Sequence, residues 1–140
     1  MKFKTLNGRE VNKSITKYLI DWTGPSLSKP QYELKRFLYS FWSTDIVCEE
    51  MPTFGLSRLR GDFVNLSRRI FIEESGEFHF SFNKHIHANN RLKFLRSIKN
   101  DENKRLWAET NRFHFIEIHA NDVKNLSVKY FKDHFDIDLM

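Results

Sequence analysis

The 140-residue sequence predicts an α/β domain in which a central mixed β-sheet is covered by helices. The first observation is the order of its patterns: a helix, three short strands, a helix, a strand and a closing helix. The second is the ring content, since 14 Phe, 3 Trp and 4 Tyr can fill a core even in a short chain. The third is the low content of 5 Gly and 3 Pro, without repeats or linkers, which predicts a single domain over residues 1–140.

The first predicted helix follows a lead-in, residues 1–27, that we expect to be irregular or partly helical. Ser28 is suited to cap this helix, and Pro30 is suited to its first turn. Residues 31–42 carry apolar side chains at the spacing of an amphipathic helix, namely Leu34, Phe37, Leu38 and Phe41.

The middle of the chain predicts strands that are short and rich in β-branched and aromatic residues. They are expected over residues 44–49, 58–66 and 69–74, with a loop over residues 51–56 after the first. The short gap between the second and third strands predicts a hairpin.

The second half predicts two helices around one strand. Residues 84–100 predict a helix, which residues 102–110 either continue or follow with another. Its expected inward side chains are Ile86, Leu92, Leu95 and Ile98. Residues 112–119 predict a strand, and residues 123–135 predict the closing helix.

The predicted hairpin brings two acidic side chains together. If it turns at Ser67 and Arg68, Asp62 lies opposite Glu73, with Cβ atoms about 4.5–5.5 Å apart on one face of the sheet. Adjacent carboxylates repel each other, and a divalent cation such as Mg²⁺ that ligates both removes the repulsion. Such a metal lowers the pKa of a bound water and stabilises charge on a phosphodiester. The alternative is that both acids lie on a solvated face and have no function.

The residues around this hairpin resemble a nuclease family. Residues 60–64 (Arg-Gly-Asp-Phe-Val) and 70–79 (Ile-Phe-Ile-Glu-Glu-Ser-Gly-Glu-Phe-His) are similar to the core of the Vsr-like small endonucleases. These belong to the restriction-endonuclease-like PD-(D/E)xK superfamily. The resemblance spans residues 28–125 and leaves residues 126–140 as a C-terminal helix and tail. It implies a restriction-endonuclease-like core and a metal-dependent endonuclease that hydrolyses phosphodiester bonds of DNA.

The resemblance also implies roles for particular residues. Asp62 and Glu73 would hold Mg²⁺, or alternatively Mn²⁺, with a main-chain carbonyl near Glu74 as a further ligand. His79 would transfer a proton or contact a phosphate. Glu77 stands where relatives often have Gln, and it would reach the metal or a water, or simply face the solvent.

Three features depart from the family pattern. The family's lysine, two residues after the second acid, is Ser75 here, and Arg60, or more weakly Lys104, is the candidate to replace its charge. The family's glutamate on the first helix is replaced by Gln31, and the candidate substitutes are Glu33, Glu49 and Glu50. The repair endonucleases bind a structural zinc through cysteine and histidine, and with Cys48 as the only cysteine no such zinc is expected.

Basic residues around the hairpin and on the second predicted helix provide candidate contacts to DNA phosphates. They are Arg58, Arg60, Arg68, Arg91, Lys93 and Lys104. A solvated helix face explains the helical members equally well.

Two further classes of function stay open beside the endonuclease. Ser75 and Gln31 favour a nuclease-like DNA- or RNA-binding module with little or no catalysis, and a protein-interaction domain is the third. The net charge of 23 − 18 = +5 permits a polyanionic partner such as DNA, and a second copy of the chain or a targeting protein are further candidates. The single cysteine and the lack of a long apolar stretch predict a cytoplasmic protein without membrane contact. For a nuclease encoded by a phage or mobile element, this would be the host-cell cytoplasm.

Overall fold

A mixed four-stranded sheet forms the centre of the protein in a computed structural model that describes residues 1–56, 58–75 and 91–140, without the side chain of Phe94. The strand order is β3 (Val47–Pro52), β4 (Arg60–Asn65), β5 (Ile70–Ser75) and β6 (His114–His119). The β3–β4 and β4–β5 pairs are antiparallel, and the β5–β6 pair is parallel. The prediction of a mixed sheet in an α/β fold is therefore confirmed.

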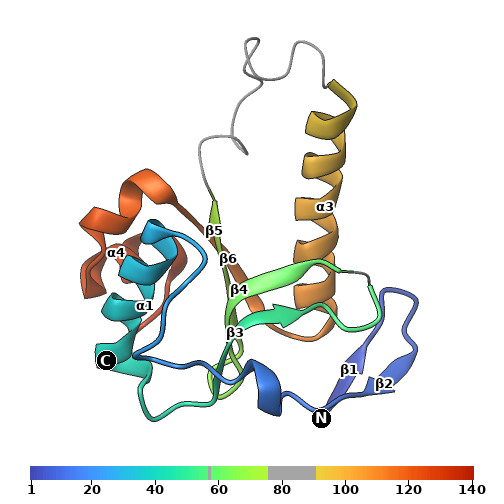
Figure 1. Ribbon diagram of the computed structural model, residues 1–140, viewed down its shortest axis with the longest axis horizontal. Coiled ribbons are helices and arrows are strands. Elements are labelled where there is room, and N and C mark those ends of the chain that lie inside the picture. Colours follow the sequence, from blue (N-terminus) through green and yellow to red (C-terminus); the bar gives the residue numbers. More distant parts are fainter. Residues whose placement is uncertain (57, 76–90) are drawn as a thin grey trace.

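Helices cover both faces of this sheet (Figure 1). Helices α1 (Lys29–Trp42) and α4 (Val128–Phe135) pack on one face, where Phe63 and Ile72 are buried. Helix α3 (Arg91–Thr110) packs on the other face, where its Trp107 meets Val64 and Phe71. Because successive residues of a strand point to opposite faces, the neighbours Phe63 and Val64 of β4 belong to different helix layers, as do Ile72 and Phe71 of β5.

Helix α1 begins as the sequence predicts. The Ser28 side chain accepts a hydrogen bond from the Gln31 backbone N–H at 3.2 Å, and Pro30 occupies the first turn. Leu34, Leu38 and Trp42 of α1 are fully buried against the sheet. The predicted amphipathic helix is confirmed.

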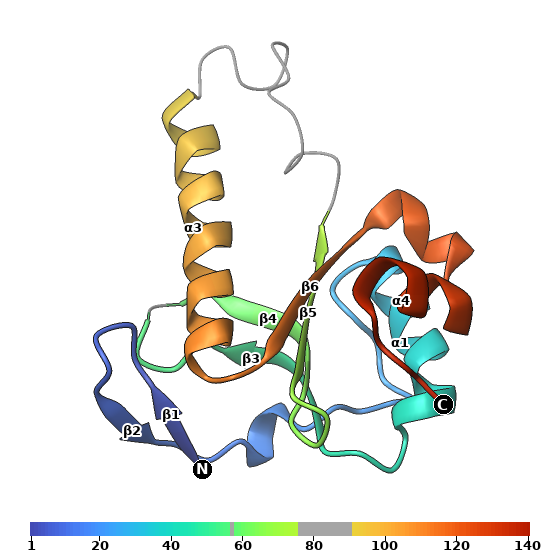
Figure 2. The same cartoon turned by 180° about the vertical axis from the view of Figure 1, so that it is seen from behind.

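The prediction of an irregular or partly helical lead-in is wrong for its first residues. They form an antiparallel hairpin of β1 (Lys2–Lys4) and β2 (Glu10–Asn12), followed by a short 3₁₀ helix, Thr16–Tyr18. Phe3 stabilises the hairpin because its ring stacks on Trp107 of α3 at a centroid distance of 5.7 Å. Figure 2 shows the hairpin beside the end of α3 from which β6 departs.

The second predicted helix also differs from the expectation. Over the described residues it runs unbroken from Arg91 to Thr110, and its first half extends beyond the sheet (Figure 1). Leu92, Leu95 and Ile98, expected to face inward, are exposed. The predicted start at residue 84, together with Ile86, lies outside the described residues.

The remaining boundaries shift by a few residues. The first strand of the sheet begins later than predicted, at Val47, and continues to Pro52 through part of the predicted loop. The predicted closing helix divides into a 3₁₀ helix, Ala120–Asn125, and α4, because Ser127 caps a new helix at the Tyr130 backbone N–H. Among the described residues, no helix is long and apolar enough to cross a membrane.

Candidate active site

The β4–β5 hairpin has the register that the predicted acidic pair requires. Its pairs run from Asn65–Ile70 to Phe63–Ile72, so Asp62 and Glu73 are the next residues of the two strands beyond the last pair. Glu73 faces α3, because its carboxylate pairs with Lys104, and Asp62 lies close enough for the charges of Glu73 and Lys104 to act on it. Glu73 also pairs with Glu117 of the parallel strand β6. We call Asp62, Glu73 and Glu117 the acidic row.

Asp62 is a partly buried carboxylate beside another carboxylate. Its Oδ2 accepts a hydrogen bond of 2.7 Å from the backbone N–H of Glu74. Burial raises the pKa of Asp62 well above its ordinary value, and the negative charge of Glu73 raises it further. The Glu74 N–H and the Lys104 ammonium act in the opposite direction without outweighing these effects on the pKa. The fold therefore holds Asp62 where a nearby cation would stabilise its charged form.

Glu73 forms an ion pair with Lys104 of α3. Lys104 Nζ lies 2.7 Å from Glu73 Oε1, and the two side chains are only 14% and 12% exposed. Burial acts to lower the pKa of Lys104, but the charge and hydrogen bond of Glu73 raise it overall. The structure thus brings the second candidate for the missing family lysine to the acids, whereas Arg60 is exposed at the start of β4.

The third acid beside Asp62 is Glu50, on the edge strand β3. The flanking β3–β4 pairs Glu49–Phe63 and Met51–Gly61 place Glu50 opposite Asp62, and its charge contributes to the raised pKa of Asp62. Glu50 has a positive φ of 56°, which interrupts the regular alternation of β3.

Gln31 of α1 connects this edge to a buried polar network that sequence reasoning missed. Its Nε2 donates to Glu49 Oε2 at 3.0 Å and to Glu50 Oε1 at 3.1 Å. Lys35, one helical turn later and fully buried, donates to Glu49 Oε1 at 2.9 Å and to two main-chain carbonyls. The acceptors of those two bonds, the carbonyls of Asp21 and Pro25, complete the three bonds that an ammonium can donate.

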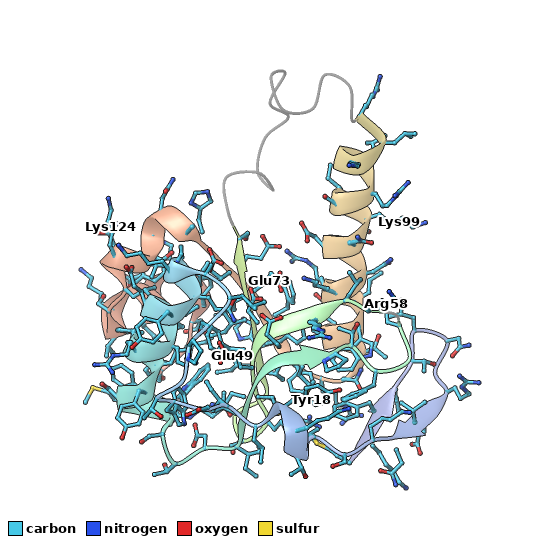
Figure 3. All side chains as sticks on the ribbon, in the orientation of Figure 1. Tyr18, Glu49, Arg58, Glu73, Lys99 and Lys124 are labelled. Carbon is cyan, nitrogen blue, oxygen red and sulfur yellow. The ribbon has the colours of Figure 1, made fainter. Side chains whose placement is uncertain are left out.

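These contacts separate the candidate substitutes for the family's glutamate. Glu49, labelled in Figure 3, is bound by Lys35 between α1 and β3. Glu50 lies beside Asp62, and Glu33 pairs with Lys29 at 4.0 Å on the exposed side of α1. The signal for Lys35 was a lysine directly beside Leu34 on the apolar stripe of an amphipathic helix.

The candidate phosphate contacts fall into separate regions of the molecule. Arg58 and Arg60 are exposed, just before β4 and at its first residue. Arg91 and Lys93 lie on the part of α3 that extends beyond the sheet, as does Lys99, labelled in Figure 3. The guanidinium of Arg68 contacts Asp45 at 2.8 Å and the carbonyls of Leu139 and Phe41 at 3.1 and 3.2 Å, which fastens the C-terminal tail to the sheet.

The remaining candidate catalytic residues follow β5. Ser75 is buried, and its Oγ has no hydrogen-bond partner within the described part of the chain. Glu77 and His79, as well as the other histidines before residue 90, lie outside the described residues. Within the described ranges, no three His, Cys, Asp or Glu side chains are arranged to hold a metal ion together.

Comparison of the chain with protein-family models, with curated proteins and with solved structures gave no match.

Proposed function

We propose that this protein is a metal-dependent DNA endonuclease with a restriction-endonuclease-like core, in which Asp62 and Glu73 hold a Mg²⁺ ion. The observation that carries the proposal is the placement of the two carboxylates on adjacent strands, one of them with a pKa raised by burial and by the other. If the two acids had only a structural role, a neutral residue at one of the two positions would make the fold more stable, because neighbouring carboxylates repel each other.

The donor set is consistent with Mg²⁺. This ion binds oxygen ligands, needs only one or two protein carboxylates, and keeps several waters for a phosphate substrate. When bound, it would lower the pKa of a water and stabilise negative charge on the phosphodiester. Asp62 and Glu73 are its ligands, and the main-chain carbonyl of Glu74, whose N–H orients Asp62, is a further candidate.

Lys104 takes the place of the family's lysine in this proposal. Its ammonium lies at the acidic pair but is attached to α3 rather than to β5. A positive charge at this point would orient the attacked phosphate and balance the charge that develops in the transition state. Ser75, which stands at the family's lysine position, then does not need to supply the positive charge.

The test is cleavage of supercoiled plasmid in Mg²⁺, Mn²⁺ and EDTA. We expect metal-dependent nicking or linearisation by the natural chain, and loss of at least about 100-fold in Asp62→Asn and Glu73→Gln. The matched control is Glu109→Gln, which changes an exposed acid at the C-terminal end of α3 and should keep full activity. Equal cleavage by Asp62→Asn and Glu109→Gln would refute the assignment of the site.

The ion pair of Glu73 with Lys104 favours a second candidate, a nuclease-like DNA-binding module without catalysis. In that case the lysine already balances the charge of Glu73, and the site needs no metal. Such a module binds duplex DNA with the same affinity in Mg²⁺ and in EDTA and leaves plasmid intact in both. A catalyst loses cleavage but keeps DNA affinity in Glu73→Gln.

A further inference from the structure

A basic pocket lies at the other end of the sheet from the acidic row. It has a volume of about 270 Å³ and is formed by the β1–β2 hairpin, the end of α3 and the two turns that lead into β5 and β6. Four of its lining side chains are cationic: Lys2, Lys4, Arg69 and Arg112. Small-molecule sites usually occupy about 300–1,000 Å³, so this volume suits one small charged group.

The charges around the pocket are not balanced by the protein. The four cationic side chains face one acid in the lining, Glu10, and the C-terminal end of α3, which carries about half a negative charge. Within the described residues, none of these five side chains takes part in an ion pair. Clustered like charges repel each other, and an anion in the pocket would remove that repulsion.

A buried asparagine fixes the walls of the pocket. Asn111 is 9% exposed, and its Oδ1 accepts from the Lys4 backbone N–H at 2.7 Å. Its Nδ2 donates to the Lys4 carbonyl at 3.0 Å and to the Trp107 carbonyl at 2.9 Å. This one side chain joins β1 to the last turn of α3, so Lys4 of β1 and Arg112 of the turn after α3 are held at the same opening.

Both arginines stand in turns at positions that favour glycine. Arg69 has φ 60° and Arg112 has φ 62°, in the left-handed region that L-residues seldom adopt. A 2.8 Å hydrogen bond from the His114 N–H to the Arg69 carbonyl ties the two turns together. Glycine would relieve the strained backbone at either turn, and arginine instead places a guanidinium at the pocket.

We propose that this pocket binds a phosphate group. Arginine and lysine together are suited to it, because guanidinium gives paired hydrogen bonds and ammonium gives a point charge. Thr110 adds a hydroxyl group to the same lining. The phosphate comes either from the backbone of a nucleic acid or from a free phosphate ion, and both present the same chemistry to the pocket.

The test compares the natural chain with the double variant Arg69→Gly/Arg112→Gly, in EDTA throughout so that cleavage plays no part. Binding of a fluorescent 20-base-pair duplex is measured by anisotropy between 50 and 200 mM salt. Thermal unfolding is measured in about 20 mM inorganic phosphate and in chloride of equal ionic strength. Asp136→Gly is the matched control, because Asp136 also has a positive φ, of 56°, at the C-cap of α4 and does not belong to the residues that line the pocket.

Two results support the proposal and identify the source of the phosphate. For a nucleic-acid backbone, the double variant binds the duplex about tenfold more weakly, and the slope of log K against log salt becomes shallower by about one to two. For a free phosphate ion, phosphate raises the melting temperature of the natural chain and the control but not of the double variant, and duplex binding is equal in all three.

The proposal is overturned if the double variant matches the natural chain in both measurements. Glycine at a left-handed position preserves the backbone of both turns, but Arg69→Gly also removes the guanidinium that lies 4.8 Å from the centroid of the Phe113 ring, so the melting temperature in chloride is the check on the fold. Should it melt lower, Lys4→Gln repeats both measurements, since it removes one charge and keeps the Lys4 backbone bonds to Asn111. Because neither measurement needs a metal or catalysis, the pocket and the proposed endonuclease can fail separately.

Discussion

Replacing Asp62 by asparagine should stabilise the metal-free protein at neutral pH. The change keeps an oxygen that accepts the 2.7 Å hydrogen bond from the Glu74 N–H and removes the negative charge beside Glu73. Most substitutions at a partly buried polar position destabilise a protein, so the expected sign is specific to a carboxylate in an unfavourable electrostatic environment.

The size of the effect follows from the geometry. Two unit charges about 5 Å apart repel by about 3 kcal/mol at an effective dielectric constant of about 20. Replacing a charged acceptor by a neutral one weakens the hydrogen bond from Glu74 by about 1 kcal/mol, and losing the attraction to Lys104 takes away a further part. We therefore expect Asp62→Asn to gain about 1–2 kcal/mol, or about 3–8 °C in melting temperature.

The gain should depend on pH in one direction. Because the pKa of Asp62 is raised in the folded state, the unfolded chain releases this proton first as the pH rises above 3.8. The natural protein thus loses stability from that pH up to the folded pKa of Asp62, while Asp62→Asn does not. The difference between the two proteins is small near pH 4 and reaches its full size above the folded pKa.

The assay is thermal unfolding followed by circular dichroism in EDTA, between pH 4 and pH 8. Asp133→Asn, an exposed aspartate on α4, is the control and should leave the melting temperature unchanged. The reasoning is refuted if Asp62→Asn melts below the natural protein at pH 7.5, or if its advantage grows as the pH falls. Added Mg²⁺ should stabilise the natural protein and leave Asp62→Asn unaffected, which ties this measurement to the proposed metal site.

Three further predictions concern the rest of the fold. Lys35→Met removes the 2.9 Å partner of the partly buried Glu49, to which Ser26 and Gln31 still donate, and should lower the free energy of unfolding by about 3 kcal/mol; an equal urea midpoint would contradict the role of the network. Burial raises the pKa of the Cys48 thiol to about 11. Ellman's reagent at pH 8 should therefore react with Cys48 only as the chain unfolds, and rapid labelling of the native protein would count against the burial of the thiol. Gly55 has φ +83°, and a Cβ added there would lie against the Thr5 methyl group. Gly55→Ala should therefore lower the melting temperature by several degrees, and an unchanged melting temperature in calorimetry would disprove the close approach of Gly55 to Thr5.

The parts of the fold that sequence reasoning predicted correctly depend on short-range patterns. The register of the β4–β5 hairpin follows from the short connection between two apolar strands, and it makes Asp62 and Glu73 the next residues beyond the last pair, Phe63–Ile72. Helix α1 follows from the Ser28 cap and the apolar spacing after it. In both cases neighbouring residues contain enough information to determine the structure.

The parts that were missed depend on contacts between distant segments. Strands of three residues, such as β1, give too short a pattern to recognise, and Phe3 holds β1 by stacking on Trp107 from the far half of the chain. Lys104 could be named as a candidate, but only the packing of α3 decides between it and Arg60. For Leu92 and its exposed neighbours on α3, periodicity identifies an apolar stripe without showing whether anything covers it.

The parallel β5–β6 pair has a consequence for the order of folding. Strands β3, β4 and β5 follow one another along the chain and pair in antiparallel fashion, so they can form by local loop closure. Strand β6 pairs with β5 only after the long intervening segment, which contains α3, has been closed. The hairpin that juxtaposes Asp62 and Glu73 can therefore form early, while Lys104 arrives with α3 in a later step. During folding, the two carboxylates would stand together before their lysine reaches them, and metal ions or protons in solution would then influence the rate.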